Sequence, residues 1–221
     1  MNNISVIIPA FNEQKCIKKV IKLVKKNENV DDIIVVDNNS TDATALVAQK
    51  ESVKVLFCKE QGKGYAIEMG LKEAKNEIVV FIDADISNYS EDLIQTLSLP
   101  LLNKKADFVK SMFERTGGRV TELVAKPLLS ILFPEIYKFS QPLSGMIAGK
   151  KSILSKIEFE KDYGVDIGIL LDMIEMGVKI EEVHIGTIKN DSQHWKNLEK
   201  MSREVMNAII SRYRTKKYNN I

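Results

Sequence analysis

The sequence predicts an α/β protein with a mainly parallel central sheet flanked by helices. Short apolar runs rich in β-branched residues alternate with stretches of helical periodicity through the first half of the chain. Polar residues follow several of these runs directly, where strands are expected to end at the edge of an open sheet. With 44% hydrophobic and 28% charged residues, the 221-residue chain has the composition of one ordinary globular domain, and it can bury a large core without disulfides.

In the first half, each predicted strand is followed by a helix, which is the order of βαβ units. The expected strands span residues 4–8, 32–36, 53–58 and 78–82. The expected helices span residues 13–26, 43–50 and 65–74, with a loop at 62–64 before the third. The polar cluster at 37–42 is expected to cap the second helix, because Ser and Asp side chains accept hydrogen bonds from its free N–H groups.

In the second half, the pattern predicts strands at 106–112, 145–148 and 180–185. Helices are expected at 120–139, with a break near Phe133 and Pro134, and at 165–176 and 198–213. No element is assigned to the stretch between the strand at 78–82 and the strand at 106–112.

Charge and cysteine usage exclude several classes of function. The net charge is +2 with both signs interspersed, which gives no reason to propose a nucleic-acid binder. The basic cluster at 212–217 is interpreted as a solvated chain end. Cys16 and Cys58 have no metal-binding or redox spacing. The sequence has neither a leader-like start nor an apolar run long enough for a transmembrane segment, so we expect a cytoplasmic protein.

Two aspartates, Asp83 and Asp85, come directly after the strongly apolar strand predicted at 78–82. Neighbouring carboxylates repel each other and are costly to desolvate unless a cation lies between them. Mg²⁺ and Mn²⁺ prefer carboxylate oxygens and keep coordination places for water and phosphates. The pair therefore predicts a metal–diphosphate site at the sheet edge. The alternative is that Asp83 caps a turn and Asp85 is a solvated loop residue.

Polar residues also follow the first two predicted strands. Asp37 ends the second strand, and the run from Pro9 to Glu13 follows the first. We expect these ends to meet, so that Pro9 and Ala10 offer backbone groups to a nucleotide and Asp37 offers a carboxylate; each also fits a helix cap. The 62–64 loop, Gly-Lys-Gly, offers a flexible backbone and one cation that could close over a base or phosphate, or it is a turn without function.

The motifs VIIPAFNE, VVDNNSTD, GKG and FIDAD resemble those of glycosyltransferases of the GT-A fold, which has a Rossmann-like sheet. In the second half, GGRVTELVAKPLLSILFPE, QPLSGM, YGVDIGILLDM and NLEKMSREVM are similar to glucosyl-3-phosphoglycerate synthases and the related mannosyl enzymes. The resemblance covers nearly the whole chain. It implies a retaining hexosyltransferase and a homodimer, with a nucleotide-sugar-binding half at 1–100 and an acceptor-binding half at 101–221.

The resemblance also implies the substrates and the residues that bind the donor. The implied donor is UDP-glucose, with GDP-mannose and GDP-glucose as alternatives, and the implied metal is Mg²⁺ or Mn²⁺. Asp83 and Asp85 would flank the ion. The residues implied to bind the nucleotide are Pro9, Ala10, Glu13, Asp37, Ser40, Lys63, Asp83 and Ala84.

The implied acceptor is a small phosphorylated acid such as 3-phosphoglycerate. By resemblance, Tyr163 and Leu143 line the junction between the two substrates, and Asp166 lies near the sugar and the acceptor. The residues implied to hold the acceptor are Gly118, Arg119, Val120, Thr121 and Leu143, and those implied to act in catalysis are Asp85, Arg119, Tyr163 and Asp166. The residue types agree with an anion site, because a guanidinium binds phosphate or carboxylate bidentately next to a helix start. The alternative is a helix N-terminus with a surface arginine.

Some positions depart from the family pattern. Asn190 stands where a histidine commonly completes the metal site, and an oxygen of Asn190 or Asp191 can replace it; His194 is near enough in sequence to be considered. His184 lies in the apolar run at 180–185 and is interpreted as a core residue. The pair at 38–39, Asn-Asn, replaces the more common Asp-Gly and is interpreted as tolerated turn chemistry.

Three other functions share part of this pattern. A nucleotidyltransferase would carry a glycine-rich, basic loop after the first strand, where this chain has PAFNE. A polyprenyl-phosphate sugar transferase would share the first half but not the motifs of the second. A non-catalytic sugar-nucleotide-binding protein would be consistent with the missing histidine.

Overall fold

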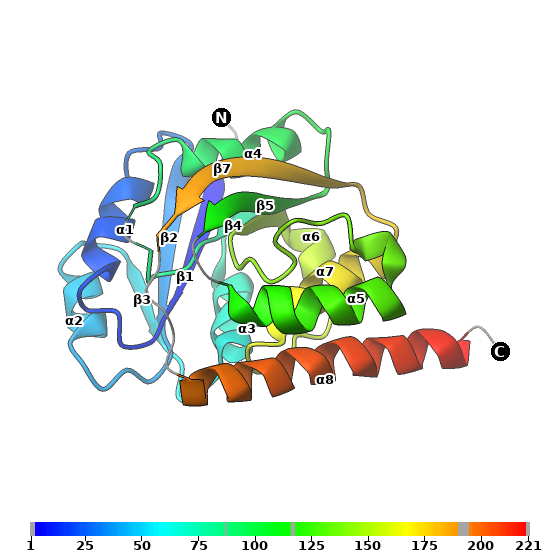
Figure 1. The fold of residues 1–221 in the computed structure, drawn as a ribbon. Helices are drawn as coiled ribbons and strands as arrows, with labels where there is room; N and C mark the ends of the chain where they lie inside the picture. Colours follow the sequence, from blue (N-terminus) through cyan, green and yellow to red (C-terminus); the bar gives the residue numbers. More distant parts are fainter. Residues whose placement is uncertain (1–2, 87, 116–117, 190–194, 220–221) are drawn as a thin grey trace.

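A computed structural model describes residues 3–86, 88–115, 118–189 and 195–219. The strands are β1 Ile4–Ala10, β2 Val30–Asp37, β3 Lys54–Phe57, β4 Ile78–Phe81, β5 Phe108–Arg115, β6 Ile147–Lys150 and β7 Ile180–Ile188. Within the described residues they form one sheet in the order β3-β2-β1-β4-β6-β5-β7 (Figure 1). β6 runs antiparallel to β4 and β5, and the other neighbouring pairs are parallel. The predicted mainly parallel α/β fold is therefore confirmed.

Helices cover both faces of this sheet (Figure 1). They are α1 Ile17–Val24, α2 Thr44–Gln49, α3 Lys63–Glu73, α4 Leu93–Leu102, η1 Thr121–Ala125, α5 Lys126–Leu132, η2 Pro134–Ile136, α6 Lys151–Leu154, α7 Val165–Glu175 and α8 Trp195–Asn219. Among the described helices, none combines the length and the apolar run that crossing a bilayer requires.

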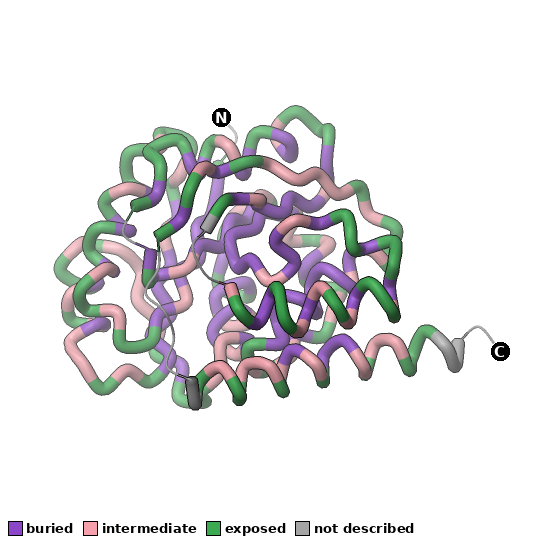
Figure 2. Tube along the Cα trace, viewed as in Figure 1, coloured by how far each residue is buried: buried purple, intermediate pink, exposed green. Residues whose placement is uncertain are grey.

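Each face of the sheet carries its own hydrophobic core. In β1, Val6 and Ile8 are buried in the core with α1 and α4, whereas Ile7 is buried in the core with α3 and α7. Successive side chains of a strand point to opposite faces, so one strand supplies both cores. Figure 2 shows this buried layer at the centre of the molecule, with exposed residues on the outer surfaces of the helices.

Two helices, α4 and the short α6, were missing from the prediction. α4 occupies most of the unassigned stretch after β4 and buries Leu93, Ile94, Leu97 and Leu101 against the sheet. Pro100 near its end weakens the helical pattern in the sequence, yet the buried leucines keep the helix in place. The break predicted near Phe133 is confirmed, because α5 ends at Leu132 and η2 begins at Pro134.

The sequence indicated that the basic cluster at 212–217 is a solvated chain end. For Arg212 this interpretation is wrong. The guanidinium of Arg212 donates to both carboxylate oxygens of Asp172, at 2.6 and 2.9 Å, and to Glu160 Oε1 at 2.6 Å. Its side chain is only 13% exposed. This ion-pair network fixes α8 against α7.

We expect Arg212→Ala to lower the free energy of unfolding by about 3 kcal/mol, because it leaves two carboxylates without their shared cation. Urea unfolding followed by circular dichroism measures this change. The matched control is Arg203→Ala, which removes an exposed pair with Glu199 on the same helix and should cost less than about 0.5 kcal/mol. Equal effects of the two substitutions would contradict the assignment.

Candidate active site

The carboxyl ends of β1, β2 and β4 lie side by side. Ala10 pairs with Asp37 in the register of β1 and β2, and Ile7 pairs with Phe81 in the register of β1 and β4. Asp83 follows Phe81 by two residues and so comes to the same edge of the sheet. This confirms that the three polar strand ends converge, as expected for parallel strands.

The loops that follow β1 and β2 bind each other. The backbone N–H of Asn12 donates to Ser40 Oγ at 2.9 Å, and the N–H of Thr41 donates to Asn12 Oδ1 at 2.8 Å. The N–H of Glu13 donates to Thr44 Oγ1 at 2.8 Å. Asn12 has a φ of 58°, a conformation that asparagine tolerates better than most residues. Ser40 therefore shapes the loop after β1.

Asp37 is a buried carboxylate with one oxygen still to satisfy. It is 3% exposed, and its Oδ2 accepts from the Ser40 N–H at 3.4 Å. Its Oδ1 has no hydrogen-bond partner among the described residues. Because buried carboxylate oxygens are normally hydrogen-bonded, Asp37 is suited to accept an N–H or O–H group from a ligand.

Lys63 links parts of the chain that are far apart in sequence. Its Nζ donates to Asp83 Oδ1 at 2.9 Å and to Asp166 Oδ2 at 2.7 Å. Burial disfavours the charged form of Lys63, but the negative charges of Asp166 and Asp83 outweigh the effect of burial. They raise the pKa of Lys63 above its usual range. Burial also raises the pKa of Asp166, against the charge of Lys63. The ammonium therefore joins the end of β4 to the first turn of α7.

The glycines beside Lys63 have a packing role that corrects the predicted flexible loop. α3 already begins at Lys63, and a Cβ at Gly62 or Gly64 would lie 2.1 Å from the carbonyl oxygen of Lys161 or 1.6 Å from that of Glu160. Only glycine permits this approach of two backbones. The 62–64 stretch is therefore held under another segment, and it aims Lys63 at the carboxylates.

Carboxylates gather around the end of β4. Burial and the charges of Asp85, Asp42 and Asp83 raise the pKa of Glu13 to about 7. Burial and the charges of Asp83 and Asp85 likewise raise the pKa of Tyr89 well above its usual range. Excess negative charge among hard oxygen donors fits a divalent cation, which would relieve the repulsion.

The chain matches the model of glycosyl transferase family 2 over residues 5–158, more than half of its length. The chain belongs to this family. It is therefore a glycosyltransferase, and its helix-flanked sheet is the GT-A fold that the motifs predicted.

Among curated proteins, glucosyl-3-phosphoglycerate synthases are similar to this chain. The synthase of Petrotoga mobilis is 34% identical over 236 aligned positions, which cover 95% of this chain and 73% of the relative. The synthase of Mycobacterium tuberculosis is 36% identical with the same coverage. A crystal structure of the latter, in complex with Mn²⁺, UDP-glucose and phosphoglyceric acid, matches with a TM-score of 0.90 over 96% of this chain and 80% of that one. Another, with Mg²⁺ and UDP, also has a TM-score of 0.90.

The second-half residues that resemble the acceptor site of this family lie in different surroundings. Gly118 has a φ of 83° and is followed by exposed Arg119 at the start of the helical stretch. Val120 and Thr121 are buried, and Val120 packs in the core. Of these residues, only Arg119 presents a largely exposed side chain.

Leu143 and Tyr163 are both accessible in part. Leu143 is half-buried, and Tyr163 is 42% exposed. Burial raises the pKa of Tyr163, Lys63 lowers it and Asp85 raises it, which brings the phenol into the same electrostatic environment as the carboxylates. On the donor side, Ala10 and Ala84 have buried side chains, so only their backbone groups can reach a nucleotide.

The interpretation of His184 as a core residue is wrong. Its side chain is 47% exposed, and its Nε2 lies 3.0 Å from Glu114 Oε1. β7 is an edge strand, so apolar neighbours in sequence do not ensure burial of both its faces. Asn190, Asp191 and His194 lie outside the described residues. Within the described part, no three His, Cys, Asp or Glu side chains form a metal-binding group.

Sequence reasoning also missed residues that support the site. Asn38 is buried and does more than form a turn: its Nδ2 donates to the Glu60 carbonyl at 2.7 Å, and its Oδ1 accepts from the Gly62 N–H at 2.8 Å. It thereby connects the end of β2 to the start of α3. Asparagine at a strand end is a weak signal, because it equally fits an exposed turn.

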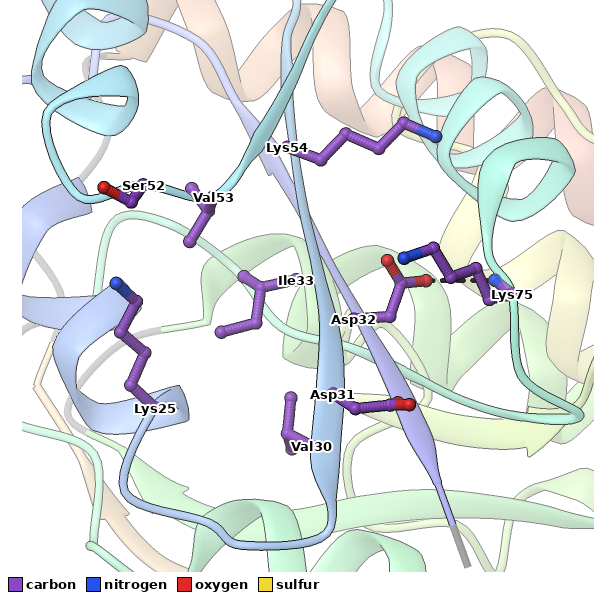
Figure 3. A pocket seen from close by; sticks show the side chains of 9 residues that line it. All are labelled: Lys25, Val30, Asp31, Asp32, Ile33, Ser52, Val53, Lys54 and Lys75. Atoms are coloured by element: carbon purple, nitrogen blue, oxygen red, sulfur yellow. Dashed lines mark hydrogen bonds between the residues drawn. The ribbon is translucent and has the colours of Figure 1, made fainter.

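A hollow elsewhere on the molecule is not part of this site. It lies at the amino end of β2. Figure 3 shows Asp32 turned toward Lys75, and the backbone N–H of Lys75 donates to Asp32 Oδ2 at 2.9 Å. Lys54 at its rim pairs with Glu73. Because these charges already have partners, the hollow gives no sign of ligand chemistry.

The surroundings of Gly145, the glycine of the QPLSGM motif, leave no space for a side chain. A Cβ at this position would lie 2.4 Å from Lys63 Nζ and 2.6 Å from Asp83 Oδ1. We expect Gly145→Ala to displace the Lys63 ammonium and to lower kcat by about 100-fold, because small shifts of catalytic groups have large effects on rate. The measurement is a double-mutant cycle with Lys63→Met, in which Gly145→Ala should have little further effect. Additive losses would show that Gly145 acts elsewhere.

Proposed function

We propose that this glycosyltransferase moves glucose from UDP-glucose to 3-phosphoglycerate with retention of the anomeric configuration. The observation that carries the proposal is the link through Lys63, which joins Asp83 at the end of β4 to Asp166 on α7. These two carboxylates come from the parts of the chain assigned to the donor and the acceptor. The similarity to the synthase that binds Mn²⁺, UDP-glucose and phosphoglyceric acid supports these substrates.

We assign donor binding to the converging strand ends. Asp37 would accept a hydrogen bond from the base or a ribose hydroxyl through Oδ1, which has no partner among the described residues. Lys63 would exchange one of its carboxylate partners for a diphosphate oxygen. The full donor set is Pro9, Ala10, Glu13, Asp37, Ser40, Lys63, Asp83 and Ala84.

Asp83 and Asp85 would hold Mg²⁺ or Mn²⁺, with Asn190 as a further oxygen ligand. When bound, the ion supplies Lewis-acid stabilisation of the charge that develops on the leaving diphosphate. The hydroxyl of Tyr89 donates to the Asp83 carbonyl at 3.0 Å and so fixes the backbone between the two aspartates.

We assign the acceptor to the start of the helical stretch after β5. Arg119 would bind its phosphate or carboxylate, with Gly118, Val120 and Thr121 contributing backbone groups or a hydroxyl. Leu143 and Tyr163 would line the junction between the substrates. The acceptor hydroxyl would attack the face of the anomeric carbon that the diphosphate leaves, and its proton would pass to a phosphate oxygen of that diphosphate. The side chains named here would act chiefly by orienting the two substrates.

The proposed organisation follows the sheet. β1 to β4 belong to the nucleotide-sugar half at 1–100, and β5 to β7 belong to the acceptor half at 101–221. A homodimer and a cytoplasmic location stay predictions. Light scattering during size-exclusion chromatography would measure the oligomeric state.

The test is a substrate screen with product detection by mass. UDP-glucose, GDP-glucose and GDP-mannose are each combined with 3-phosphoglycerate and with Mg²⁺ or Mn²⁺. We expect glucosyl-3-phosphoglycerate, with release of UDP only when the acceptor is present. Transfer to a polyprenyl phosphate instead would contradict the acceptor, and formation of a product only from a GDP-sugar would contradict the donor.

A further inference from the structure

Lys110 is a buried lysine on β5, the strand next to the β7 edge of the sheet. It lies on β5 between β6 and β7 and is 0% exposed. Burial lowers the pKa of Lys110 to about 8, although the nearby carboxylate of Asp166 opposes this effect. A buried ammonium is costly, so its hydrogen-bond partners indicate what it does for the structure.

Within the described part of the chain, both hydrogen-bond partners of the Lys110 ammonium are backbone carbonyls. Its Nζ donates to the carbonyl oxygen of Ser144 at 2.7 Å and to the carbonyl oxygen of Asp166 at 3.4 Å. Ser144 belongs to the segment 140–145 that precedes β6, and Asp166 belongs to the first turn of α7. One ammonium thus sets the distance between two segments that are separate in the sequence.

Other side chains of the sheet hold the 140–145 segment in the same place. The hydroxyls of Ser111 and Ser144 are 2.6 Å apart, and Gln141 Nε2 donates to the Phe113 carbonyl at 3.1 Å. The N–H of Ser140 donates to Glu182 Oε1 at 3.0 Å. β5 and β7 therefore anchor this segment along its length.

The two segments that Lys110 joins are those that contact Lys63. Gly145 packs against Lys63 Nζ and the Asp83 carboxylate, and Asp166 accepts from Lys63 Nζ at 2.7 Å. A shift of either backbone would change the position of the ammonium of Lys63. Among the described residues, the hydrogen bonds of Lys110 go to backbone carbonyls and not to these carboxylates. Its effect on the carboxylates therefore passes through the two backbones and through charge.

We propose that Lys110 is a positioning residue for sugar transfer: it holds the 140–145 segment and the first turn of α7 at the spacing that aligns Lys63, Asp83 and Asp166. This role rests on the proposed function, since these three residues are assigned there to the reacting groups. A lysine that only stabilised the fold would affect unfolding and leave the kcat of the folded enzyme unchanged.

The test compares Lys110→Met with Lys22→Met, which removes the same charge from an exposed position on α1. We expect Lys110→Met to lower kcat by about 100-fold, with KM for both substrates within about threefold, because misplacement of catalytic groups affects the reaction more than binding. Lys22→Met should match the wild type. A folded Lys110→Met enzyme with wild-type kcat would overturn the proposal.

Two further measurements keep the result decisive. If Lys110→Met does not fold, Lys110→Gln takes its place: its shorter, uncharged side chain cannot span both carbonyls, so kcat should fall in the same way, and wild-type kcat in this variant would overturn the proposal. If the wild type makes no glucosyl-3-phosphoglycerate, the proposed function fails, and a crystal structure of Lys110→Met, or of Lys110→Gln where Lys110→Met does not fold, decides the positioning role alone. We expect the 140–145 segment to shift and Lys63 to lose one carboxylate; an unmoved segment would contradict this.

Discussion

Asp85→Ala is expected to reduce sugar transfer by about 1000-fold while leaving the fold intact. Asp85 is exposed after the end of β4, so its removal takes away no core packing. In the proposed site it would hold the metal together with Asp83. Losing the Lewis-acid stabilisation of the leaving diphosphate would raise the free energy of the transition state by several kcal/mol. The measurements are kcat with UDP-glucose and 3-phosphoglycerate, and thermal unfolding by circular dichroism.

The matched control is Glu91→Ala, which removes an exposed carboxylate on the same segment after β4. Its activity should stay within about twofold of the wild type. Asp85→Asn keeps one oxygen ligand without the charge, and we expect it to require a higher Mn²⁺ concentration for half-maximal rate. Turnover near the wild-type value in Asp85→Ala would defeat the metal assignment.

The donor side could be predicted from sequence because parallel strands share one end. Asp37, Asp83 and the run after β1 each lie at or just beyond the end of a strand, so the topology alone brings them together. The same logic gives the mainly parallel order of the sheet. It does not reveal that β6 is antiparallel, since a short apolar strand carries no direction in its residues.

Contacts between distant parts of the chain could not be predicted in this way. Lys63 and Asp166 are 103 residues apart, and only the tertiary fold brings them within 2.7 Å. Lys110 was overlooked because a lysine in a strand is usually exposed. Gly64 was interpreted as part of a flexible loop and Gly145 as the start of a strand, whereas their neighbours in space leave no room for a side chain.

Arg119→Ala is expected to raise the KM for 3-phosphoglycerate by about 30-fold with little change in the KM for UDP-glucose. Arg119 is exposed at the start of the helical stretch after β5, where free N–H groups and the helix dipole also favour an anion. A charge-assisted hydrogen bond contributes about 2 kcal/mol, which is a change of this size in binding.

The partition of the effect between the two substrates decides whether Arg119 belongs to the acceptor site. Arg119→Lys keeps the charge but loses the planar fork that binds two oxygens at once, so its KM for the acceptor should fall between those of Arg119→Ala and the wild type. UDP binding in the presence of Mn²⁺, measured by calorimetry, should be the same in all three proteins. An equal loss of UDP binding and acceptor affinity would contradict the assignment of Arg119 to the acceptor. The proposed anion site after β5 would then lack the cation on which it depends.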